Sequence, residues 1–125
     1  MKKIISTKNA PAAIGPYSQA VEAGGLIFIS GQLPIDPATG AMAPAEIKAQ
    51  TEAVLKNIAG ILKAEGLAPE NVLKTTVFMA DLGQFAQMNE VYSKFFPANA
   101  PARATIEVKA LPRAALVEIE AVAAR

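Results

Sequence analysis

The chain has 125 residues, of which 52% are hydrophobic and 18% charged, and its formal net charge is +1. This length suits one domain, so we expect residues 1–125 to form a single one. A charge so close to zero gives no field to hold nucleic acid or an anionic membrane, and we expect neither as a partner. Cysteine and histidine are absent, which excludes disulfides, thiolate nucleophiles and imidazole catalysis. Acid–base chemistry is left to Asp, Glu, Lys, Tyr or water.

The N-terminal residues 1–6 are basic and soon turn polar, without the apolar run of a signal peptide. The longest apolar run in the chain is far too short to span a bilayer. We therefore expect a soluble, cytoplasmic protein.

The first half of the chain has the pattern of short strands followed by a long helix. Ile4-Ile5 and residues 19–23 are strand candidates, and Gly24-Gly25 predicts a turn after the second. Leu26–Ile29 is apolar at every position, which is typical of a strand buried on both faces. A helix is predicted from about Ala45 to Glu65. Its apolar stripe at helical spacing consists of Ile47, Thr51, Val54, Leu55, Ile58, Ile61 and Leu62.

The second half continues with a strand over Val72–Met79 and a second helix, which Asp81 is predicted to cap and Pro97 to end. We interpret the apolar stripe of this helix as core; it consists of Phe85, Met88, Tyr92, Phe95 and Phe96. Two further strands are predicted at Ala104–Val108 and Leu116–Ala123. Helices that link consecutive strands favour right-handed crossovers and parallel neighbours, with both helices on one face of the sheet. The other face, which includes part of Leu26–Ile29, is then apolar and uncovered, and this predicts an oligomer.

Two kinds of charged residue on these strands are candidates for chemistry. Arg103 is flanked only by alanines, so it either grips the carboxylate of a small substrate with its planar fork or makes a structural ion pair elsewhere. Glu118 and Glu120 share one face of the last strand because side chains alternate along a strand. Alternation alone does not choose between the two carboxylates.

Three blocks of sequence occur in order along the chain. They are Ala13–Ala20 with Ile29–Gln32; Val72–Phe78 with Asp81-Leu82, Phe85 and Asn89; and Pro101–Arg103 with Leu111-Pro112 and Val117–Ala121. In this order and spacing they resemble the Rid family, the YjgF-type imine deaminases, and most closely its RidA subgroup. The resemblance implies an α+β, chorismate-mutase-like domain with a six-stranded mixed sheet and two helices on one face. It also implies a homotrimer with active sites in the clefts between subunits.

The resemblance further implies where the last strand lies. In the family fold it is inserted between the strands that correspond to Leu26–Gly31 and Val72–Met79. The short link Lys109–Ala114, considered by itself, would also allow the last two strands to pair as a hairpin.

The same resemblance implies the site residues and the reaction. Arg103 would bind the substrate carboxylate, Glu118 would place water and transfer protons, and Tyr17 would supply a hydroxyl. Gly31 would offer backbone contact and Asn89 a polar wall. Thr105 is also expected to line the substrate site; it stands where many relatives have a cysteine, and activity should survive because the chemistry uses no thiolate.

The implied activity is that of a 2-iminobutanoate/2-iminopropanoate deaminase, which needs no cofactor and no metal. The alternative is a non-catalytic trimer that binds small 2-keto acids. Arg103 would serve either protein, whereas Glu118 favours the enzyme, because a pure binder has no use for a carboxylate beside an anionic ligand. An RNA-cleaving role, which has been attached to relatives, is disfavoured by the near-zero net charge and the missing histidines.

Overall fold

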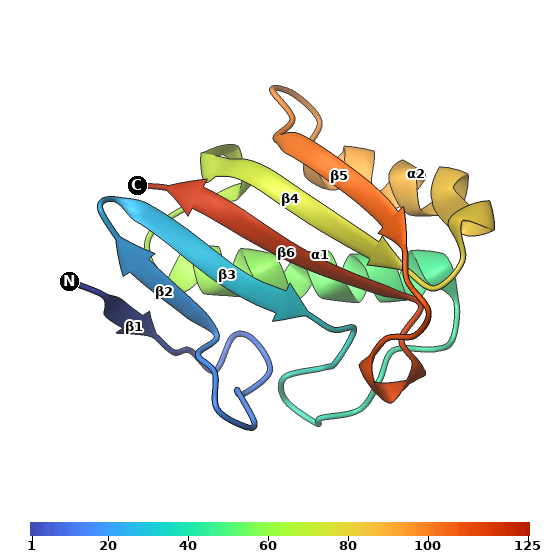
Figure 1. Ribbon diagram of the computed structural model, residues 1–125, viewed down its shortest axis with the longest axis horizontal. Helices are drawn as coiled ribbons and strands as arrows, with labels where there is room; N and C mark the ends of the chain where they lie inside the picture. The colour runs from blue at the N-terminus through green and yellow to red at the C-terminus, as the bar shows by residue number, and fades with distance from the viewer.

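The computed structural model describes residues 1–125 and contains one six-stranded sheet and two α-helices. In chain order the elements are β1 (Lys3–Ile5), β2 (Ala20–Ala23), β3 (Leu26–Gln32), α1 (Ile47–Ala64), β4 (Val72–Met79), α2 (Phe85–Phe95), β5 (Ala102–Glu107) and β6 (Val117–Ala124). Short 3₁₀ segments precede β4, α2 and β6. Both helices lie on the same side of the sheet, behind it in Figure 1. The α+β class, the six strands and the shared helix face are therefore confirmed.

The strand order is β1-β2-β3-β6-β4-β5. The last strand, β6, lies between β3 and β4 and is antiparallel to both, so the insertion implied by the family resemblance is confirmed and the hairpin does not form. β4 and β5 are parallel neighbours, as a helical crossover predicts. We expected β3 and β4 to be parallel neighbours as well, and this was wrong, because β6 lies between them (Figure 1).

The core lies between the sheet and α1. All seven residues of the predicted apolar stripe of α1 are buried, although the helix begins at Ile47 rather than Ala45. They pack against the inward residues of β6, namely Val117, Ile119, Ala121 and Ala123. Gly66 follows the helix with a φ of +71°, a left-handed conformation that favours glycine.

The second helix differs from its prediction in two respects. Asp81 accepts a hydrogen bond from the Gly83 N–H and so caps the 3₁₀ segment Leu82–Gln84, which runs directly into α2. Phe85 is exposed rather than buried in the core, because it lies at the helix border, over Arg103.

The face of the sheet opposite the helices is open and carries a row of apolar side chains. Pairing across the sheet aligns Ile4 of β1, Val21 of β2, Phe28 of β3 and Val122 of β6 in one row on this open face. The side chain of Phe28 is 44% exposed. The strand β3 is thus buried on one face only within a single chain, and its other face is left uncovered, as the sequence predicts.

Near its end, β3 leaves regular pairing. Its register against β6 shifts between Ile29 and Gln32, so Ser30 and Gly31 form a β-bulge. The bulge places the Gly31 backbone over a side chain of β6, and this irregularity becomes part of the candidate site.

Neither α1 nor α2 combines the length and the apolar character that crossing a membrane requires.

Candidate functional site

Arg103 lies at the centre of a cluster formed by β5 and α2. Its Nη1 donates a hydrogen bond of 2.7 Å to the Asn89 Oδ1. The guanidinium carbon lies 4.6 Å from the ring centroid of Tyr92 and 5.4 Å from that of Phe85. No carboxylate pairs with Arg103 in the chain. We call Arg103, Asn89, Thr105, Phe85 and Tyr92 the arginine cluster.

The register of β5 explains why Arg103 meets α2. Arg103 is the pairing partner of Thr75 on β4, and Thr75 is buried on the helix face of the sheet. The Thr75 and Tyr92 hydroxyls are joined by a hydrogen bond of 2.7 Å, which fixes the ring on which the guanidinium rests. Burial raises the pKa of Tyr92, so this hydroxyl stays protonated at neutral pH. Contact with two rings and an amide leaves much of the planar fork of Arg103 free for an anion.

Thr105 lies two residues further along β5 and on the same face as Arg103. Its Oγ1 is the one buried side-chain polar atom in the protein without a hydrogen-bond partner. A buried hydroxyl without a partner is unfavourable unless a ligand or a neighbouring molecule supplies one. The arginine cluster therefore offers a cation, an amide and a free hydroxyl to the same region.

A second cluster lies on the open face. A pocket of about 670 Å³ is lined by fourteen residues, among them Tyr17, Gly31, Glu118, Glu120 and Arg113. We call it the glutamate pocket. It collects residues from the loop before β2, the bulge of β3, the strand β6 and the loop before β6.

Gly31 has a specific reason to be glycine in the glutamate pocket. A Cβ atom added at this position would overlap the Glu118 Oε2 and lie 2.9 Å from the Glu118 Cδ. The bulge in β3 and the missing side chain together make room for the carboxylate. The sequence predicts that glycine at position 31 lets the backbone approach a ligand closely. In the structure, the group that lies against this backbone is the Glu118 carboxylate.

Burial raises the pKa of Glu118 above its usual value, and the negative charge of Glu120 raises it further. No salt bridge holds Glu118 in its ionised form. A carboxylate with a raised pKa is a stronger base than an ordinary one, so it accepts and returns a proton near neutral pH more readily. Glu118 is half-buried whereas Glu120 is exposed, so burial distinguishes the two carboxylates, which residue alternation did not.

Tyr17 lies in the loop before β2, with its side chain 54% exposed. Its hydroxyl accepts a hydrogen bond of 3.4 Å from the Ile14 N–H, so the phenolic proton remains available to another group. The backbone around it is tied to β3, since the Ser30 hydroxyl donates to the Ser18 carbonyl at 2.6 Å.

The structure brings the predicted site residues together as two groups rather than one. Asn89, Arg103 and Thr105 lie in the arginine cluster, on the side of the sheet that α2 covers. Tyr17, Gly31 and Glu118 lie in the glutamate pocket, on the open face. A single chain therefore does not place Arg103 beside Glu118.

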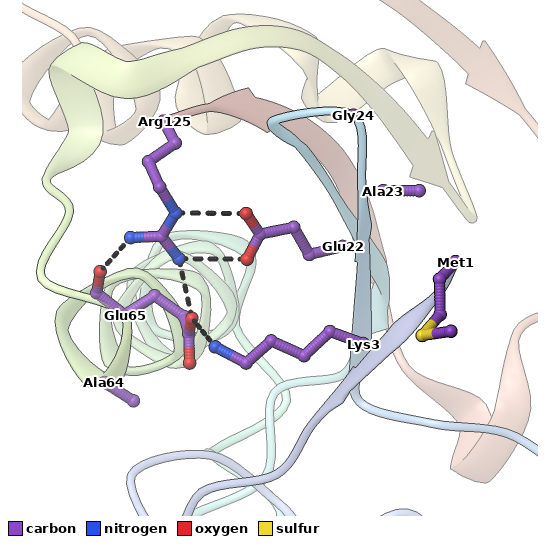
Figure 2. Close-up of a pocket in the computed structure, with 8 residues that line it drawn as sticks. All are labelled: Met1, Lys3, Glu22, Ala23, Gly24, Ala64, Glu65 and Arg125. Atoms are coloured by element: carbon purple, nitrogen blue, oxygen red, sulfur yellow. Dashed lines mark hydrogen bonds and ion pairs between the residues drawn. The ribbon is translucent and has the colours of Figure 1, made fainter.

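Another hollow lies at the far end of the sheet, between the C-terminus, β2 and the end of α1 (Figure 2). Arg125 makes two hydrogen bonds of 3.0 Å to the Glu22 carboxylate, and its Nη2 lies 2.7 Å from a Glu65 oxygen that Lys3 also binds. These charges are paired with one another, and Arg125 lowers the pKa of Glu22. The cluster ties the last strand to α1 and contains none of the predicted site residues.

The apolar stripe of α2 predicts Phe85 and Tyr92 as core residues and gives no link between them and Arg103. Helical spacing places Phe85 and Tyr92 on the same side of α2 as Asn89. This spacing is the feature of the sequence that could have assigned the two rings to the site. No group of three or more Asp or Glu side chains is arranged to hold a metal ion.

Comparison with known proteins shows that nearly the whole chain is similar to members of one family. Residues 7–125 match the family model described as Endoribonuclease L-PSP. A RutC family protein of Pyrococcus horikoshii is 52% identical over 123 residues, which cover 98% of each chain. A Mus musculus protein named 2-iminobutanoate/2-iminopropanoate deaminase is 50% identical over 123 residues, which cover 98% of this chain and 91% of that protein.

Solved structures agree with the sequence comparison. The crystal structure of the YjgF gene product of E. coli is 48% identical, covers 98% of both chains and superposes with a TM-score of 0.93. The crystal structure of E. coli TdcF with bound serine is 45% identical, also covers 98% of both chains and gives a TM-score of 0.94.

Proposed function

The chain belongs to the Rid family, whose model carries the description Endoribonuclease L-PSP, and on this premise we propose that it hydrolyses reactive 2-imino acids to 2-keto acids and ammonia. 2-Iminopropanoate and 2-iminobutanoate are the proposed substrates. The observation that carries this proposal is the half-buried Glu118, whose pKa is raised, in a protein with a separate, unpaired arginine. The relative named as a deaminase of these two compounds supports the same reaction.

The active site is proposed to form between subunits of a homotrimer. The arginine cluster of one subunit would face the glutamate pocket of its neighbour, because the two groups lie on opposite sides of the sheet within one chain. The apolar open face gives a reason to assemble, since Ile4, Phe28 and Ile106 are each 44% exposed or more. Closed cyclic symmetry would produce three equivalent sites.

In the proposed reaction Arg103 binds the substrate carboxylate with its guanidinium fork. Glu118, in its ionised form, accepts a proton from water while the water oxygen bonds to the imine carbon and the C=N π electrons move to nitrogen. Glu118 then returns this proton to the nitrogen. When the carbonyl forms, Glu118 transfers the remaining hydroxyl proton to the nitrogen in the same way. The C–N bond then breaks and releases ammonia. One water is consumed, and no oxidant or cofactor takes part.

The other residues are proposed to hold the substrate. Asn89 orients the guanidinium through its 2.7 Å hydrogen bond. The Thr105 hydroxyl, which lacks a partner in the chain, donates to the substrate carboxylate. Tyr17 donates its phenolic proton to the water or to the carbinolamine oxygen. Serine in the TdcF structure supports a site of amino-acid size.

The direct test is release of ammonia and keto acid from freshly generated 2-aminoacrylate, measured with and without the protein. We expect keto acid to form faster than by spontaneous hydrolysis and in proportion to protein concentration. A rate equal to the protein-free rate, together with measurable pyruvate binding, would replace the enzyme by a keto-acid binder.

A further inference from the structure

Gln19 is one of six buried polar residues, and its side chain is 4% exposed. Its Oε1 accepts a hydrogen bond from the Thr7 N–H at 2.6 Å. Its Nε2 donates to the carbonyls of Thr7, Ala10 and Pro11 at 3.0, 3.2 and 2.8 Å. The two N–H groups thus serve three acceptors, and no donor is left for a ligand. The Gln19 side chain is therefore bonded entirely to the backbone of residues 7–11.

The segment that Gln19 holds continues directly into a wall of the glutamate pocket. Pro11, Ala12, Ile14 and Tyr17 line this pocket with Glu118. Residues 11–18 form no helix or strand, so no ladder of backbone hydrogen bonds fixes them.

The loop is anchored at its two ends and free between them. Gln19 holds the incoming end, and Ser30 holds the outgoing end through the Ser18 and Gln19 carbonyls. Between the anchors, the hydrogen bonds of Tyr17 are only local, to Gly15 and Ile14, and Ile14 is 86% exposed. The hydrogen bonds that tie this loop to the rest of the fold are thus those of its two anchors.

We infer that Gln19 is a positioning residue for the reaction: its buried amide sets the loop that carries Tyr17 against Glu118. The inference rests on the proposed function. A displacement of about 1 Å in a reacting group lowers a rate by up to roughly 100-fold, so loss of this anchor is expected to lower kcat. Substrate affinity should change little, because Arg103 lies in the other cluster.

The test uses Gln19→Met, which keeps the length of the side chain and removes all four hydrogen bonds. Gln50→Met is the matched control. Gln50 is equally buried and bonds the backbone of Ala43 and Leu116, but it does not line the glutamate pocket. We expect both variants to lose stability, whereas only Gln19→Met loses kcat, by roughly tenfold or more, with KM within about twofold of wild type.

Loop order is read separately from activity. The chain has no tryptophan and two tyrosines, so in a Tyr92→Phe background Tyr17 is the sole tyrosine fluorophore. Its residual anisotropy should fall when Gln19→Met is added and stay unchanged when Gln50→Met is added. This readout does not require turnover, so it distinguishes failure of the inference from failure of the proposed reaction.

Four outcomes would overturn the inference. One is an unchanged kcat in a folded Gln19→Met protein, another is an equal loss of kcat in Gln50→Met, and a third is a Tyr17 anisotropy that does not fall in Gln19→Met. If Gln19→Met does not fold, Gln19→Glu, which keeps the acceptor for the Thr7 N–H, takes its place in the same measurements. If neither variant folds, Gln19 serves the fold alone and the inference is rejected.

Discussion

Arg103 and Glu118 lie on opposite faces of one sheet. Arg103 on β5 pairs with Thr75 of β4, whose side chain is buried under the helices, whereas Glu118 on β6 pairs with Phe78, which points to the open face. Side chains alternate along a strand, so no rotamer change brings these two residues together. A reaction that uses both therefore requires a second copy of the chain.

This relationship predicts complementation between two inactive variants. Arg103→Ala and Glu118→Ala trimers should each lack an intact site. Mixed trimers of either composition should contain one site with an unaltered Arg103 and an unaltered Glu118. Random exchange at equal amounts should restore about a quarter of wild-type activity, given cyclic threefold symmetry.

The exchange is made by mild denaturation and refolding of the mixture, and each variant treated alone is the control. Sedimentation equilibrium confirms the trimer in every sample. A mixture that forms mixed trimers but stays inactive would contradict a site shared between subunits.

Arg103→Lys should lower kcat/KM while the protein stays folded. Lysine keeps the charge but loses the planar fork and its contact with the rings of Phe85 and Tyr92. Loss of a hydrogen-bonded charge pair costs on the order of 2–4 kcal/mol, which corresponds to a decrease of roughly 30- to 1,000-fold. Steady-state kinetics check the decrease, and near-normal activity would make Arg103 a structural residue.

Glu118→Gln should separate binding from hydrolysis. The amide has the same shape and still fits over Gly31, but it does not accept a proton from water. Hydrolysis should fall by roughly 100-fold or more, while calorimetry should show pyruvate or 2-oxobutanoate bound as tightly or more tightly, because a negative charge near the anion is gone. Loss of binding together with the trimer would assign Glu118 to the fold.

Glu120→Gln should shift the pH dependence of kcat/KM. The charge of Glu120 raises the pKa of Glu118, so its removal lowers that pKa. If ionised Glu118 is the base, activity is lost as pH falls through its pKa, and the acid limb of the variant should lie at lower pH than that of wild type. The test is to record kcat/KM against pH from about pH 4 to 8 for both proteins, corrected for spontaneous hydrolysis, and to compare the positions of the two acid limbs. An acid limb that stays in place or moves to higher pH would argue against it.

Gly31→Ala should lower activity by displacing the Glu118 carboxylate, which a Cβ at this position would overlap. Gly66→Ala is the matched control, because Gly66 has open space around it and a φ of +71°, and it does not line the glutamate pocket. We expect the control to lose stability only, through backbone strain. Thermal unfolding and kinetics on both variants provide the measurement, and equal activity losses would contradict a specific role for Gly31.

The sequence by itself determined most of the secondary structure and the chemistry available to the protein. The stripe of α1 from Ile47 to Leu62 and the strand Val72–Met79 follow from periodicities of 3.6 and 2, which depend on residues close in the chain. The absence of histidine and cysteine left carboxylates as the main acid–base groups. Family resemblance then indicated Arg103 and Glu118, although residue alternation alone left Glu118 and Glu120 equivalent.

The tertiary structure decided how these residues relate in space. The insertion of β6 between β3 and β4 joins segments distant in the chain, and the local pattern allowed a hairpin equally well. That pairing fixes the register, and the register assigns Arg103 to the helix face and Glu118 to the open face. The raised pKa of Glu118 depends on burial and on Glu120, and the role of Gln19 depends on three carbonyls of a folded loop. Local periodicity carries no information on such contacts, because strand pairing and burial arise only when the whole sheet has formed.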